Sequence, residues 1–354
     1  MAKSKQLKRL DELPNHEHVK AIRDADRQVA KLKSELESER RKRAQAEAEV
    51  LEANTRADLA EILRDAPSDP KPFAIPAKKC GDATAIICMN DWHVEEKVDP
   101  RTINGLNEYN LEIAAKRIKR AFQNSIKLLD SERSISKIRD AKLWLGGDLI
   151  TGYIHEELAE ENYLSPTEAT LFAHEHAADG IQTLLDHGNL EYLEVICSWG
   201  NHGRTTRKPR TSTAYKTSYE WLMYQYLAKV FAKNPKVRFT IATAYHIYAD
   251  VQGKTVRLHH GDKLKYQGGV GGLTIPVEKA IAAWNKSRHA DLDVFGHWHQ
   301  AMFAPRWICC NCIIGTSSYG LNDVKAPHAP PSQTLIVVAK NHPRWVTAKE
   351  IFCD

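Results

Sequence analysis

The chain has 354 residues, of which 42% are hydrophobic and 27% are charged, the balance of an ordinary globular protein and not of a chain disordered throughout. Its 50 basic and 45 acidic residues give a formal net charge of +5, which permits an anionic partner without requiring one. No apolar run is long enough to span a membrane, and the N-terminal segment lacks the apolar core of a secretory signal, so we expect a cytoplasmic protein.

Residues 1–66 differ in composition from the rest of the chain. They are rich in Lys, Arg, Glu and Ala, contain no glycine, and carry sparse aliphatic residues with a heptad spacing that weakens at Glu39 and Arg43. This pattern predicts a long N-terminal coiled-coil helix, which we expect to act as an arm for homo-oligomerisation. A solvated single helix without a partner is the alternative. The two core positions of the heptad are occupied by Ile22, Val29, Leu36, Val50 and Ala57, and by Ala25, Leu32, Ala46, Ala53 and Ala60.

Residues 67–80 contain four prolines, which forbid a continuing helix, so we expect a linker between the arm and a domain that spans residues 81–354. From there, short apolar runs alternate with helical periodicity, and this β-α-β-α order passes into strand-rich sequence. The predicted strands lie at 84–89, 141–145, 192–197, 247–251, 255–259, 292–295, near Ile313 and at 335–339. The predicted helices lie at 111–129, 166–185 and 218–231.

Five of the predicted strands end on a small polar cluster. In chain order the clusters read D-x-H, G-D, G-N-H, H-H-G-D and G-H-x-H. Because the carboxyl ends of strands gather at one edge of an open α/β sheet, we expect these clusters to meet at one site. The candidate ligands in them are Asp91, His93, Asp148, Asn201, His260, His297 and His299.

These side chains are of the types that bind divalent metal ions. Carboxylates suit magnesium and manganese, and imidazoles suit zinc, iron and manganese. One ion uses about four to six ligands, so this larger set predicts two ions that share a bridging carboxylate. In D-x-H and H-x-H, a strand would place both side chains on one face. Any one cluster alone is weak evidence, whereas all five in this order are strong evidence.

The five clusters, in this order, resemble the calcineurin-like metallophosphoesterases over about residues 84–317. The resemblance implies an α/β fold, a two-sheet sandwich flanked by helices, with two divalent metal ions between its loops. Manganese is our first expectation for these ions, with iron, zinc or magnesium as alternatives. The resemblance implies that Asp91, His93 and His299 hold the first ion and that Asp148 bridges the two.

By the same resemblance, Asn201, His260 and His297 would hold the second ion. His202 would be a catalytic residue that stabilises or protonates the leaving group, and Asp148 would share in catalysis through its bridging position. His259 would replace His260 as the ligand if the strand register were shifted by one residue. Two such ions lower the pKa of a bridging water, and the resulting hydroxide would attack phosphorus in line.

Two departures from the family pattern bear on the substrate. Gly203 follows G-N-H where the family often has an acidic residue, so any acidic partner of His202 must come from elsewhere. The Asp-Arg pair that follows G-D in Ser/Thr protein phosphatases is missing after Asp148, which lowers the expectation of a protein phosphatase.

A basic run follows the G-N-H cluster directly and would lie at the edge of the metal site. Its cations, which we expect to bind the phosphates of a substrate, are Arg204, Arg207, Lys208 and Arg210. A solvated loop, or one neutralised by the acidic segment at Glu156–Glu161, is the alternative.

The sequence as a whole favours a metal-dependent phosphodiesterase or nuclease that acts on DNA. The run G-N-H-G-R-T-T also resembles a subgroup associated with bacteriophage genomes, which points weakly the same way. The first alternative is a phosphatase or phosphodiesterase for a small phosphorylated molecule or nucleotide. A non-catalytic scaffold on the same fold is a further alternative, which the complete ligand set disfavours.

Overall fold

The computed structural model describes residues 15–64, 72–74, 81–266 and 272–354. The chain divides into two units, Met1–Pro76 and Ala77–Asp354. The linker predicted at 67–80 lies outside the described residues apart from 72–74. Among the helices in the described ranges, none is both long and apolar enough to cross a membrane.

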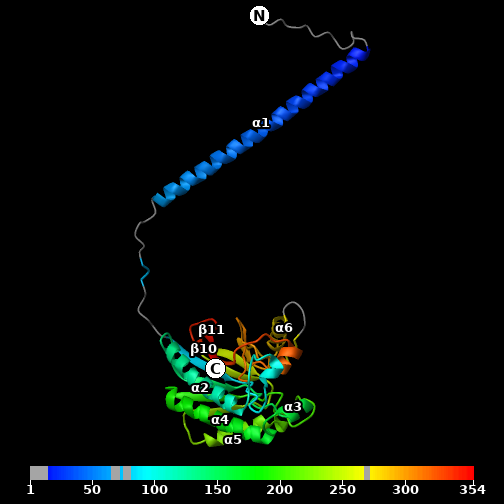
Figure 1. Ribbon diagram of the computed structural model, residues 1–354. Coiled ribbons are helices and arrows are strands. Elements are labelled where there is room, and N and C mark those ends of the chain that lie inside the picture. Colours follow the sequence, from blue (N-terminus) through cyan, green and yellow to red (C-terminus); the bar gives the residue numbers. More distant parts are fainter. Residues whose placement is uncertain (1–14, 65–71, 75–80, 267–271) are drawn as a thin grey trace. The chain divides into compact units, whose positions relative to one another are not determined.

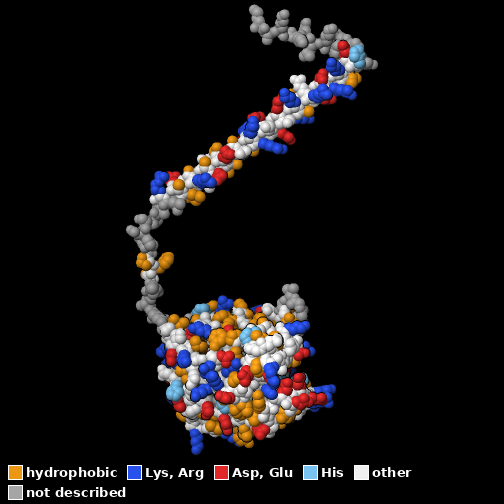
Figure 2. All heavy atoms as spheres, viewed as in Figure 1, with side chains coloured by type: hydrophobic (Ala, Val, Ile, Leu, Met, Phe, Trp, Pro, Cys, Tyr) orange, Lys and Arg blue, Asp and Glu red, His pale blue; other side chains and the backbone are white. Residues whose placement is uncertain are grey.

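The first unit contains the helix α1 (Asn15–Arg64), which is 50 residues long. Basic and acidic side chains alternate along it, with hydrophobic side chains between them (Figure 2). Pairs such as Arg43 with Glu47, at 2.9 Å, each support an isolated helix by about 0.2–0.5 kcal/mol. The heptad residues Val29, Leu36 and Val50 are 50–60% exposed. A coiled-coil partner for this stripe stays a prediction.

The second unit contains two β-sheets and the helices that connect and cover their strands (Figure 1). Its strands are β1 (Asp82–Met89), β2 (Lys137–Leu145), β3 (Tyr192–Cys197), β4 (Val237–Ile241), β5 (Ile247–Val251), β6 (Lys254–His259), β7 (Leu292–Phe295), β8 (Met302–Ala304), β9 (Trp307–Cys309), β10 (Ser332–Ala339) and β11 (Trp345–Phe352). Its α-helices are α2 (Leu111–Arg133), α3 (Glu156–Glu161), α4 (Pro166–His187), α5 (Tyr219–Val230) and α6 (Thr274–Trp284).

The strand order is β11-β10-β1-β2-β3-β4 in the first sheet and β5-β6-β7-β9-β8 in the second. In the first sheet β1 to β4 run parallel, and β10 pairs antiparallel with β1. In the second sheet β6, β7 and β9 run parallel, and the edge strands β5 and β8 are antiparallel. The carboxyl ends of β1, β2 and β3, and those of β6 and β7, are therefore the positions at which the five polar clusters emerge.

Both faces of the first sheet are buried, and β1 shows why its sequence is continuously apolar. Its residues Ala85, Ile87 and Met89 pack into the core beneath α2, α4 and α5, whereas Ile86 and Cys88 pack between the two sheets. The outer face of the second sheet packs against α6. The result is a helix–sheet–sheet–helix sandwich in which parallel strands are buried on both sides.

This mixed α/β architecture, with two sheets and flanking helices, is consistent with the predicted metallophosphoesterase-type sandwich. The strand predicted near Ile313 is wrong, because β9 ends at Cys309 and the Ile313 amide donates 3.0 Å to the carbonyl of Asp91 instead of joining a ladder. The buried apolar run at 307–314 resembled one strand, but only its first three residues pair with neighbouring strands. The α-helices and strands that the sequence analysis missed are α3, α6, β4, β8, β9 and β11.

Candidate metal centre

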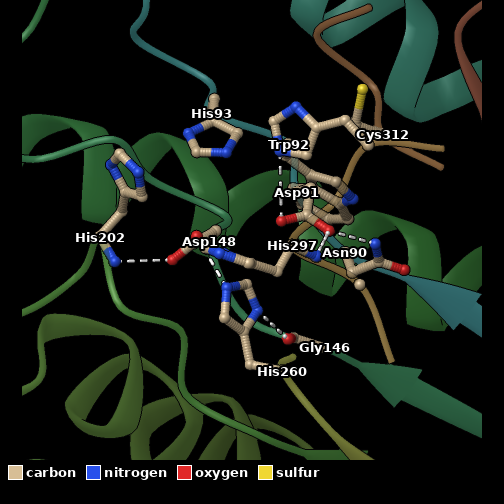
Figure 3. A network of polar contacts seen from close by, with 12 residues as sticks. Asn90, Asp91, Trp92, His93, Gly146, Asp148, His202, His260, His297 and Cys312 are labelled. Atoms are coloured by element: carbon tan, nitrogen blue, oxygen red, sulfur yellow. Dashed lines mark hydrogen bonds and ion pairs between the residues drawn. The ribbon is translucent and has the colours of Figure 1, made fainter. Parts of the chain in front are cut away.

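The polar clusters meet in one place, although they are up to about two hundred residues apart in sequence (Figure 3). Asp91, His93 and His299 form one group, in which one ligand atom from each lies within 4.8 Å of the others. Asp148, His260 and His297 form a second group with the same spacing. We call these the first and the second metal position. Each offers a carboxylate and two imidazoles, a donor set that suits zinc, iron or manganese.

At the first position, donor atoms point inward without a hydrogen-bond partner. Asp91 is fully buried, and its Oδ2 accepts from the side-chain amide of Asn90 at 2.5 Å and from the amide of His297 at 2.8 Å. Its Oδ1 makes only a long contact, 3.5 Å, with Nε2 of His299, and Nε2 of the buried His93 has no hydrogen-bond partner. Buried polar atoms are almost always satisfied, so an unbonded imidazole nitrogen and a weakly bonded carboxylate oxygen in one cluster fit a bound cation. This observation is independent of the resemblance.

The ring of His93 is oriented by a chain of hydrogen bonds. Its Nδ1 lies 3.1 Å from Oγ1 of Thr151, which in turn lies 3.2 Å from a carboxylate oxygen of Glu96. The Thr151 hydroxyl donates its single hydrogen to Glu96, so it must accept a hydrogen bond from Nδ1 of His93. Nδ1 therefore carries the ring proton, and Nε2 keeps a free lone pair. A ligand histidine is commonly held in this way by its second ring nitrogen.

At the second position, His260 lies between three acceptors. Its Nδ1 donates 2.9 Å to the carbonyl of Gly146, and its Nε2 lies 2.9 Å from Oδ2 of Asp148 and 3.0 Å from Oδ1 of Asn201. Asn201 thus belongs to the second position. His259 instead packs among aromatic rings, stacked on Phe295 at 5.4 Å. The structure therefore places His260 in the cluster and His259 outside it.

The electrostatics of the second position also fit a cation. Burial disfavours the charged form of His260, but the nearby Asp148 carboxylate outweighs it and raises the pKa of His260 to about 10. Burial also opposes ionisation of Asp148, yet His260 and His202 hold its pKa well below the usual range. In the absence of metal, the proton on His260 balances the carboxylate of Asp148, whereas burial lowers the pKa of His297 to about 4. A divalent cation would supply positive charge in place of that proton.

The ligand-bearing loops adopt a backbone conformation that the sequence did not reveal. Asp91, His93, Asp148, His297 and His299 all have φ between 49° and 68°, in the left-handed region that residues other than glycine seldom enter. The expectation that D-x-H and H-x-H lie on strands is therefore wrong, because these residues follow the ends of β1 and β7. Strained backbone of this kind is found where a site requires it.

Glycines allow the loops to approach each other closely. A Cβ on Gly200 would lie 2.1 Å from Oδ1 of Asp148, and a Cβ on Gly147 would lie 2.4 Å from the amide nitrogen of Gly200. A Cβ on Gly296 would likewise lie 2.3 Å from Oδ2 of Asp91. Any other residue would displace a candidate ligand at position 200 or 296, and at position 147 would push the neighbouring loop away.

His202 lies beside both positions but is bonded differently from the ligands. Its amide donates 2.7 Å to Oδ1 of Asp148, and its Nδ1 donates 3.0 Å to the carbonyl of Thr151. Its ring meets that of His93 edge-on, with centroids 4.8 Å apart. Burial lowers the pKa of His202. The sequence analysis expected any acidic partner of His202 to come from elsewhere in the chain, but the structure gives it the neutral carbonyl of Thr151 instead. Nε2 of His202 is not used in this bond.

Two buried glutamates support the loop after β2, and the sequence analysis missed both. Glu95 accepts from the amides of Thr151 at 2.9 Å and Gly152 at 2.7 Å, and burial raises its pKa to about 7. Glu220 is also fully buried, and burial together with the charge of Asp148 raises its pKa to about 8. Glu95 could have been noticed because it lies next to the D-x-H cluster, whereas no feature of the sequence pointed to Glu220.

The predicted basic loop has two parts with different surroundings. The guanidinium of Arg204 is folded back and donates to the carbonyls of Asn201 and Thr206, at 2.5 and 3.0 Å. It thereby fixes the loop that carries Asn201. The other cations, Arg207, Lys208 and Arg210, are exposed, and within the described residues no ion pair joins them to the acidic helix α3.

Comparisons with known proteins give fold likenesses only. No protein-family model matches the chain, and no curated protein matches it. Among solved structures, it is similar to Vps29 of Entamoeba histolytica complexed with zinc (10% identity, 76% of this chain and 99% of that one, TM-score 0.29). It is also similar to the hypothetical protein PH1004 of Pyrococcus horikoshii (11% identity, 77% and 89%, TM-score 0.35). At these TM-scores the likenesses carry no argument about activity.

A third similar structure is the sulfate thiohydrolase SoxB of Thermus thermophilus in complex with glycerol. It shares 7% identity with this chain over 78% of this chain and 57% of that one, with a TM-score of 0.30. This likeness is as distant as the other two. The interpretation of the site therefore rests on the geometry of its own residues.

Divalent cations are expected to stabilise the folded protein through these two positions. A ligand that binds only the native state at about 100 times its Kd adds about 2.7 kcal/mol to the free energy of unfolding. After treatment with a chelator, manganese or zinc should therefore raise the Tm of the wild type by several degrees. Asp148→Asn should lose most of this increase, because it removes a buried carboxylate from the second position.

Asp250→Asn is the matched control, because Asp250 is exposed on β5 and should leave the increase intact. A wild-type Tm that does not respond to manganese, zinc or magnesium would contradict the assignment. An unchanged response in Asp148→Asn would contradict the place of Asp148 in it.

Proposed function

We propose that the protein is a metal-dependent phosphoric ester hydrolase, and that its substrate is DNA, cleaved as a phosphodiester. The observation that supports this most strongly is the pair of adjacent groups, each with one buried carboxylate and two imidazoles. Two divalent ions held there would supply Lewis acidity for phosphoryl oxygens and would lower the pKa of a bound water. Manganese is the first candidate for both positions.

The chain's own residues divide into three roles in this proposal. Asp91, His93 and His299 would hold the first ion, and Asp148, a member of the second group, would be shared by both ions. Asn201, His260 and His297 hold the second ion. His202 is the proposed catalytic residue that contacts the leaving oxygen through Nε2, since Thr151 occupies its Nδ1. The negative charge of a bound phosphoester opposes the lowering of its pKa and favours the protonated, donating form.

The proposed DNA substrate rests on the exposed part of the basic loop. Arg207, Lys208 and Arg210 follow Asn201 within ten residues and carry no ion-pair partner in the described part of the chain. Such cations bind the phosphate backbone without reading sequence. A small phosphorylated substrate would need no such extended row of charges.

The test of the proposed function compares substrates and one variant. Purified protein with manganese is incubated with labelled single- and double-stranded DNA, an aryl phosphomonoester and an aryl phosphodiester. We expect cleavage of DNA and of the diester. His202→Ala should bind metal as the wild type does but react about 10²–10⁴-fold more slowly, the usual contribution of a positioned acid.

Cleavage of the aryl esters alone would reject DNA and favour a small phosphorylated substrate. Absence of any cleavage would reject the hydrolase. Loss of metal from His202→Ala would show that His202 is itself a ligand.

The basic loop gives a second prediction, which is independent of turnover. Replacing Arg207, Lys208 and Arg210 by alanine should weaken binding of DNA and make its dependence on salt shallower, because each lost phosphate contact reduces the slope by about 0.7–0.9. Hydrolysis of the aryl diester should stay unchanged, since these side chains are absent from the metal positions. The corresponding control replaces Lys233, an exposed lysine that follows α5. An unchanged salt slope in the triple variant would exclude the loop from DNA binding.

A further inference from the structure

One buried carboxylate joins the two loops that carry Asp148 and Asn201. Glu220 lies in the first turn of α5 and is fully buried. Its Oε1 accepts from the amide of Leu149 at 2.6 Å, and its Oε2 accepts from the amide of Gly200 at 2.7 Å. Leu149 directly follows Asp148, and Gly200 directly precedes Asn201. Loops from two different strands are thus held by one side chain.

The bonding of Glu220 excludes it as a ligand. Each of its oxygens already accepts a short hydrogen bond from a backbone amide. The side chain contacts the backbone next to the candidate ligands and not the ligands' donor atoms.

Gly203 provides the space that this arrangement needs. A Cβ on Gly203 would lie 2.8 Å from Cγ of Glu220 and 3.1 Å from its Oε2. A side chain at position 203 and the side chain of Glu220 therefore compete for one volume. The glycine that departs from the family pattern after G-N-H is thus the counterpart of a glutamate supplied by α5.

We propose that Glu220 is a positioning residue that sets the separation of Asp148 and Asn201 and thereby tunes the affinity of the second metal position. This inference rests on the proposed metal centre and assigns a residue that takes no part in ligation. The link continues through the His202 amide, which donates 2.7 Å to Asp148, so that a shift of either loop moves the proposed catalytic histidine as well.

The test titrates manganese into full-length protein and follows it by calorimetry and by the electron paramagnetic resonance signal of the coupled ion pair. Glu220→Gln keeps the size of the side chain, but its NH₂ group would face one of the two backbone amides. Both groups are donors, so one of the two hydrogen bonds would be lost. We expect one manganese to bind as in the wild type, the second to bind about 10–100-fold more weakly, and the coupled signal to be lost at low metal concentration.

Glu132→Gln is the matched control. Glu132 is 1% exposed, lies on α2, and bonds Thr347 and Lys349, which belong to neither ligand loop. The Glu132→Gln variant should lose stability because it removes a buried charge, but it should bind both manganese ions as the wild type does. Gly203→Ala is a second variant, which displaces Glu220 without removing its carboxyl group, and it should weaken binding of the second ion in the same way.

Wild-type affinity for both ions in folded Glu220→Gln would overturn the inference. If that variant does not fold, wild-type affinity in Gly203→Ala would overturn it instead. A wild type that binds no manganese would reject the metal centre itself, which is a different outcome.

Discussion

The close approach of loops at the ends of β1, β2, β3, β6 and β7 is the constraint on which the rest of the structure depends. The carboxylate of Asp148 lies at its centre, bonded by the His202 amide and paired with His260. It fits there only because Gly200 has no side chain. The free energy of the buried core, in two sheets and their covering helices, holds these loops in conformations that they would not adopt alone.

Burial of so many polar groups is unfavourable unless they have partners. Asp91 and His93 each leave one buried atom without a hydrogen bond, whereas Asp148 and His260 are bonded by the His202 amide, by the Gly146 carbonyl and by each other. Charged groups kept in a dry interior at such a cost are typical of functional sites. The same reasoning explains why Glu95 and Glu220 lie below the site: they satisfy loop amides that would otherwise be buried without acceptors.

The order of elements and the meeting of the clusters could be predicted, because apolar strands followed by small polar residues leave a clear pattern. The six residues of β3 were predicted without error. Glu220 could not be found, because it lies on a helix far along the chain from Asp148 and no spacing connects them. The left-handed backbone of His93 is held by a tertiary hydrogen bond from its amide to the carbonyl of Asp148, and the inward turn of Arg204 by bonds to carbonyls of its own loop. Periodicity records neither. The short strands β4 and β8 are only partly buried and lack a clear alternation.

The most direct test of the central claim is an anomalous difference map from a crystal of the protein soaked in manganese. The account predicts two peaks, one among Asp91, His93 and His299 and one among Asp148, Asn201, His260 and His297. Peaks elsewhere, or none at these residues, would contradict it.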